Sequence, residues 1–140
     1  MLDIVIQGIG SRLDTVFGEE YKIYKNDIQQ GFKQPCFFVL PVAPSREQEL
    51  GSREHRTYPF DIVYTPKVNS SRDELYAVAE LLMRNLCIIE AGKLGLLRGK
   101  ELSYEVIDGQ LHFLVSYDFS LVAVGQTDEF MENLDLRGDI

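Results

Sequence analysis

Apolar and polar residues alternate most clearly between Leu97 and Val124, and this alternation predicts a long β-hairpin. The fold-back point is Asp108-Gly109, which favours a type I′ turn because both central residues of that turn need a positive φ. Alternate positions of the returning strand are apolar, so one face of it is expected to line the core. These positions are Leu111, Phe113, Val115, Tyr117, Phe119 and Leu121.

The first stretch of the chain has the three- and four-residue spacing of an amphipathic helix. Asp3 is the expected N-cap, and Gly18 the expected stop. Gly8 and Gly10 fall inside this helix and weaken it by about 1 kcal/mol each relative to alanine. Either another backbone approaches them closely, or they are simply tolerated.

A second helix is predicted from a capping box, in which Ser71 is followed three residues later by Glu74. Apolar residues then recur at helical spacing as far as Ile89, and Gly92 is the expected stop. This apolar stripe is expected to pack on the sheet.

Three shorter runs predict strands at residues 20–25, 36–42 and 58–65, the first of them at a sheet edge. The second and third are expected to pair as an antiparallel hairpin with an unusually long, polar connection. This connection is either a solvated tip or an arm that binds a partner. Its charged residues are Arg46, Glu47, Glu49, Arg53, Glu54 and Arg56.

These elements predict an α+β fold, with a mostly antiparallel sheet of about five strands and two helices packed on it, in the order α-β-β-β-α-β-β. One domain is expected over residues 1–124, followed by an acidic, amphipathic C-terminal tail at 125–140. Phe130, Met131 and Leu134 in this tail join the charged residues of the connection as the predicted oligomer or partner interface.

Composition narrows the choice of function. The 140 residues carry a formal net charge of -8, and the 14 Lys and Arg residues are scattered, which argues against sequence-specific binding of nucleic acid. We expect no membrane span, since no apolar run approaches the roughly 18 residues required. The first residues lack the features of a signal peptide, which favours a cytoplasm-like compartment.

Few residues are candidates for chemistry. Cys36 and Cys87 each lie in an apolar run without metal-ligand spacing, and both are expected to be buried free thiols. His112 and Asp108 could form an acid–base pair in a small enzyme or ligand-binding domain. An exposed or half-buried strand histidine is much commoner, so we expect no enzyme activity, no cofactor and no metal.

Four phrases carry a family resemblance along most of the chain. They are QGFKQPCFF at 30–38, RTYPFDIVY at 56–64, LRG at 97–99 and VIDGQLHF at 106–113. Together they resemble the tail terminator-like proteins encoded in the tail gene clusters of long-tailed phages and prophages. The family has no catalytic motif, so the resemblance assigns no catalytic residue.

This resemblance implies a structural role, as a subunit of a commonly hexameric ring that caps the tail tube and presents a surface for joining the head. The implied partners are further copies of the chain and the tail-tube protein, with the sheath or a head-completion protein as further candidates. The implied location is the virion tail, after assembly in the bacterial host cytoplasm. A head–tail connector or a minor tail protein is the alternative within virion proteins.

Overall fold

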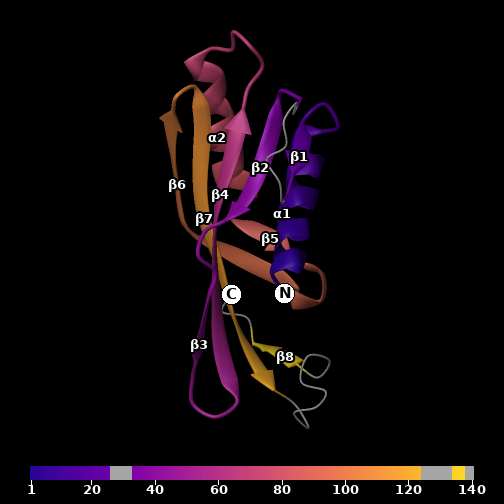
Figure 1. Cartoon of the computed structure of the whole chain (residues 1–140). Coiled ribbons are helices and arrows are strands. Elements are labelled where there is room, and N and C mark those ends of the chain that lie inside the picture. Colours follow the sequence, from indigo (N-terminus) through magenta and orange to yellow (C-terminus); the bar gives the residue numbers. More distant parts are fainter. Residues whose placement is uncertain (26–32, 124–133, 138–140) are drawn as a thin grey trace.

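The computed structural model describes residues 1–25, 33–123 and 134–137, and within them it contains two α-helices and eight strands (Figure 1). The strand order is β1-β2-β4-β7-β6-β5, with β3 added to β4 and β8 added to β7. The elements are α1 (Leu2–Phe17), β1 (Lys22–Tyr24), β2 (Cys36–Pro41), β3 (Ser45–Gln48), β4 (Arg53–Thr65), α2 (Arg72–Asn85), β5 (Ile88–Glu90), a 3-10 turn (Gly92–Leu94), β6 (Leu96–Ile107), β7 (Gln110–Ala123) and β8 (Leu134–Arg137).

The α+β class and the mostly antiparallel sheet are confirmed, since β1–β2 is the one parallel pair among the described strands. The predicted count of about five strands and the predicted order were wrong, because β3, β5 and β8 were not foreseen. Each of these strands has only three or four residues, too few for a period-two pattern to show. β1 lies at a sheet edge, as expected.

The hairpin at Asp108-Gly109 is confirmed. These two residues have φ values of 51° and 75°, and the strands close from the Ile107↔Gln110 pair onward. Farther along β6, the register shifts between Lys100 and Ser103, a β-bulge that bends this strand.

Helix α2 begins as predicted, with the Ser71 hydroxyl accepting a hydrogen bond from the backbone N–H of Glu74 at 3.3 Å. It ends at Asn85 and does not continue to Gly92. The apolar residues after it form β5, which pairs antiparallel with the start of β6. β-branched residues such as Ile88 and Ile89 suit a strand at least as well as a helix, so the spacing alone was ambiguous.

Helix α1 ends at Gly18 as expected, but its N-cap is Met1 and not Asp3. Asp3 lies in the first turn, where its carboxylate pairs with the N-terminal amine at 3.2 Å. This ion pair lowers the pKa of Asp3. A negative charge in the first turn favours the helix dipole, so the same residue stabilises the helix from a different position.

Both helices cover one face of the sheet and share one core with it. The six alternate β7 positions are all buried, with no more than 2% of any residue exposed. The Tyr117 hydroxyl donates to the carbonyl of Leu86, which ties the end of α2 to the sheet, and burial raises the pKa of this tyrosine. The opposite face carries a small apolar cluster of Cys36, Phe38 and Val63.

Gly8 confirms the close-approach explanation. A Cβ at this position would lie 2.7 Å from the carbonyl oxygen of Glu90 in β5, so the missing side chain lets α1 pack directly on the β5 backbone. At Gly10, by contrast, the nearest atom would be Cε of Lys25 at 2.9 Å, the end of a flexible side chain.

Gly8 and Gly10 therefore make a matched pair of substitutions. We expect Gly8→Ala to lower the free energy of unfolding by about 1 to 3 kcal/mol, because backbone must move to admit the methyl group. Gly10→Ala should leave it unchanged or raise it by up to about 1 kcal/mol, since Lys25 can move aside and alanine favours the helix. Urea denaturation measures both, and equal effects would contradict the packing of α1 on β5.

Candidate functional site

The six charged residues predicted as an interface lie on one structured hairpin. β3 pairs antiparallel with the start of β4, from Ser45↔Thr57 to Gln48↔Glu54, and β7 pairs with the other edge of the same part of β4. We call β3, β4 up to Thr57 and the facing part of β7 from Asp118 the distal arm. The arm lies at the end of the sheet away from α2 (Figure 1). The expected polar connection is thus a β-structure that extends the sheet.

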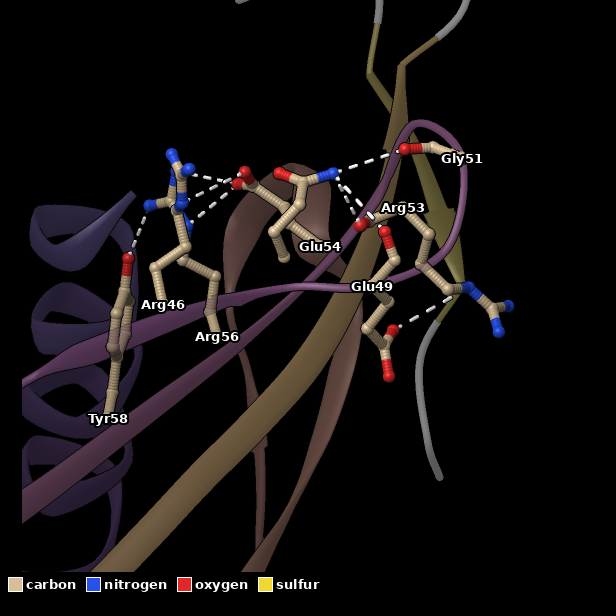
Figure 2. Close-up of polar contacts among 8 residues, drawn as sticks. Arg46, Glu49, Gly51, Arg53, Glu54, Arg56 and Tyr58 are labelled. Atoms are coloured by element: carbon tan, nitrogen blue, oxygen red, sulfur yellow. Dashed lines mark hydrogen bonds and ion pairs between the residues drawn. The ribbon is translucent and has the colours of Figure 1, made fainter.

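A buried carboxylate braces the distal arm from within. Glu54 is only 4% exposed, and its Oε1 accepts from Arg56 Nε at 2.9 Å and lies 2.8 Å from Arg56 Nη2. Its second oxygen lies 3.4 Å from Nε of Arg46 on β3 (Figure 2). Burying a carboxylate is unfavourable unless it is paired and hydrogen-bonded, so this residue holds β3 and β4 in a fixed relation.

Arg56 connects this ionic cluster to the hydrophobic core. Its Nη1 donates to the Tyr58 hydroxyl at 2.7 Å, and the ring of this tyrosine is buried (Figure 2). Burial of Arg56 works against its charge, but the hydrogen bonds and charges of Tyr58 and Glu54 outweigh burial and raise the pKa of Arg56. Arg56 therefore stays charged and joins the arm to the core.

The tip of the distal arm is ordered by backbone contacts. The Gln48 side-chain amide donates to the carbonyls of Glu49, Gly51 and Arg53 at 3.4, 3.2 and 3.1 Å. Arg53 and Glu49 also form an ion pair at 3.9 Å, but both side chains are about half exposed, so it adds little stability. Leu50, at the tip itself, is 96% exposed.

The opposite face of the distal arm carries a second polar cluster, which no sequence pattern indicates. His55 Nδ1 lies 3.0 Å from the Ser120 hydroxyl, and its Nε2 lies 3.1 Å from Asp118. Lys100 also donates to Asp118, at 3.1 Å. His55 and Ser120 are register partners in β4 and β7, so this contact can be predicted only when the strand pairing is known.

Ser, His and Asp are the residue types of a catalytic triad, but their geometry here favours a clamp between strands. Ser120 is only 3% exposed, so a substrate has little access to its hydroxyl. The cluster instead links β4 to β7, and through Lys100 to β6, at the base of the arm.

His112 pairs with a carboxylate other than Asp108, the partner that the acid–base alternative required. Nδ1 of His112 lies 3.0 Å from an oxygen of Asp61 on β4, and each of these two side chains is 24% exposed. Asp108 occupies the turn, whereas His112 lies on the strand directly opposite Val63, one diagonal step from Asp61. The histidine therefore contributes a cross-strand contact.

Shallow hollows also lie elsewhere on the described surface. One, of about 330 Å³, crosses the helix-free face beside Val42, Pro59 and Leu114. Two more, of about 310 and 480 Å³, lie beside α1, where it faces β5 and the 3-10 turn. None of these three is lined by a histidine, and the described residues contain no group of three or more His, Cys, Asp or Glu side chains that could hold a metal ion.

The two cysteines are free thiols, as predicted, although Cys87 is only half-buried. Burial raises the pKa of Cys36. Neither helix in the described part of the chain is both long and apolar enough to cross a membrane.

Comparison with known proteins gives one family. The family model described as phage tail terminator protein matches residues 4–129 of this chain. No curated protein matches. Eight chains of solved structures match. One of them, which carries only an identifier as its title, is 19% identical to this chain in sequence. The match covers 90% of this chain and 98% of the other, with a TM-score of 0.49. Similarity at that level does not assign a function.

The bracing role of Glu54 can be tested on stability. Glu54→Ala leaves Arg56 without its buried partner, so we expect the free energy of unfolding to fall by about 3 kcal/mol. Glu47→Ala, on the exposed strand β3, is the matched control and should change it by less than about 0.5 kcal/mol. Chemical denaturation monitored by circular dichroism measures both. Equal, small losses would show that the network does not brace the arm.

Proposed function

Because this chain belongs to the phage tail terminator protein family, we propose that it completes the tail, capping the tail tube and presenting the surface that joins the tube to the head. Membership of this family makes the chain a structural protein of phage tail assembly, a component of the virion tail that interacts with other tail proteins. The capping role, the ring and the individual partners are our proposals, and so is assembly in the host cytoplasm.

The observation that carries the proposal is the distal arm. All four side chains of β3 are exposed, and its outer edge has no strand partner among the described residues. Yet Glu54 and Arg56 fix the arm from inside through buried contacts. A preorganised arm loses little conformational entropy on binding, which is the property an assembly interface needs.

We propose that the arm contacts the next copy of the chain in a closed ring, with a hexamer as the expected stoichiometry. A head-to-tail contact generates a ring when its rotation closes. Exposed charges on an edge strand discourage indiscriminate strand pairing, so Arg46 and Glu47 on β3, together with Arg53, would select the correct partner by charge.

The remaining predicted interface residues lie in the C-terminal segment. Phe130 and Met131 fall outside the described residues, and Leu134 begins β8, of which the backbone is described. Their part in the interface stays a prediction.

The net charge of -8 fits the proposed role of the ring around a DNA passage. Like charge repels phosphate, so an acidic lumen would let DNA pass without holding it. A mapped lumen with a basic surface would contradict this part of the proposal.

The assembly role is tested by light scattering of the purified chain, alone and with tail-tube protein. We expect a closed oligomer that binds the tube. Charge reversal at two exposed arm residues, in Glu47→Lys and Arg53→Glu, should raise the dissociation constant of the contact between adjacent copies about tenfold, which corresponds to about 1.4 kcal/mol.

The matched control is Lys67→Glu, an exposed charge between β4 and α2, which should leave assembly unchanged. All variants should keep the melting temperature of the parent chain. A chain that stays monomeric and never engages the tube would overturn the proposed function. An oligomer indifferent to the arm variants would overturn the assignment of the interface.

A further inference from the structure

β7 is longer than the neighbour that covers one of its edges. Toward the distal arm, the last pair between β6 and β7 is Gly99↔Tyr117, whereas β7 continues to Ala123. β4 still covers the other edge as far as Val122. A strand edge with unpaired N–H and C=O groups accepts a further strand.

The C-terminal strand occupies this edge. β8 pairs antiparallel with β7 from Ser120↔Arg137 to Ala123↔Leu134, and β7 is its one strand partner among the described elements. With only four residues, β8 makes four backbone pairs with β7, so further contacts would add to its stability. A second surface, from outside the chain, would stabilise it.

The connection between the two strands does not force them to pair within one chain. Ten residues, 124–133, separate Ala123 from Leu134, whereas antiparallel neighbours are usually joined by two to five. Ten residues can span at most about 33 to 36 Å when fully extended, a reach comparable with the size of a small domain. The same four backbone pairs can form with the β7 of an adjacent copy.

We propose that β8 is exchanged between neighbouring copies in the ring: Leu134–Arg137 of each chain pairs with the Ser120–Ala123 edge of the next. Each copy then donates one strand and accepts one, which is a head-to-tail contact that closes with the ring. The exchange extends the β3-β4-β7 sheet of each distal arm by a strand from its neighbour. This inference rests on the proposed ring and names the segment that links its subunits.

Disulfide trapping tests the exchange. Two double variants, Val122→Cys with Asp135→Cys and Ala123→Cys with Leu134→Cys, place cysteines at adjacent register pairs. Adjacent antiparallel pairs alternate between close and wide spacing, so one of the two variants has the closer geometry. Cys87→Ser is the background, and buried Cys36 is retained. Oxidation of the assembled protein is followed by a denaturing gel without reductant.

We expect covalent multimers up to the full ring in at least one double variant, and at most dimers in the single variant Asp135→Cys. Disulfides confined within single chains, while light scattering shows intact rings, would overturn the exchange and leave the proposed function standing. An absence of disulfides at both pairs would show that β8 does not occupy this edge. Chains that never assemble would overturn the ring itself, and the exchange with it.

Discussion

The pairing of β4 with β7 determines which side chains face the core and where the distal arm begins. It runs without interruption from Arg53↔Val122 to Tyr64↔Leu111. Side chains alternate between faces with a period of two, so one register decides the orientation of every residue along both strands. Even-numbered residues of β4 and odd-numbered residues of β7 lie on the face that the helices cover. Ile62 and Phe113, which are register partners, both belong to the core on this face.

The same register continues past the helices into the distal arm, where the chemistry of this face changes. Tyr58 packs edge-on against Phe119, with ring centroids 5.4 Å apart, and its hydroxyl accepts from Arg56. Glu54, two residues beyond Arg56 on the same face, is buried as an ion pair. The corresponding positions in the body of the sheet are buried apolar residues instead. A polar network of this kind keeps the arm ordered while its outer strand remains hydrophilic. This combination makes the arm suited to assembly.

The sequence predicted those parts of the fold that depend on local chemistry. Positive φ at Asp108-Gly109 defined the hairpin, and the Ser71 hydroxyl defined the start of α2. Prediction from the sequence failed where the structure depends on partners that lie far apart in the chain. β5 exists because β6 pairs with it, although Ile88 and Ile89 also fit the helical spacing.

The candidate site follows the same division. Its charged residues were identified from the polar run, but the sequence could not show that Glu54 is buried or that His55 meets Asp118. Both contacts depend on strand pairings whose partners lie far apart in the chain. His112 was matched with the carboxylate nearest in sequence, whereas the register brings Asp61 to it.

We propose that the distal arm is a preformed assembly interface of a tail terminator subunit. Electron cryomicroscopy of the protein assembled on tail tubes would show this interface. We expect a closed ring in which β3 and the start of β4 of each copy contact the adjacent copy, with Glu54 still paired to Arg56. A ring in which the arm touches neither a neighbouring copy nor the tube would show that the arm is not an assembly interface.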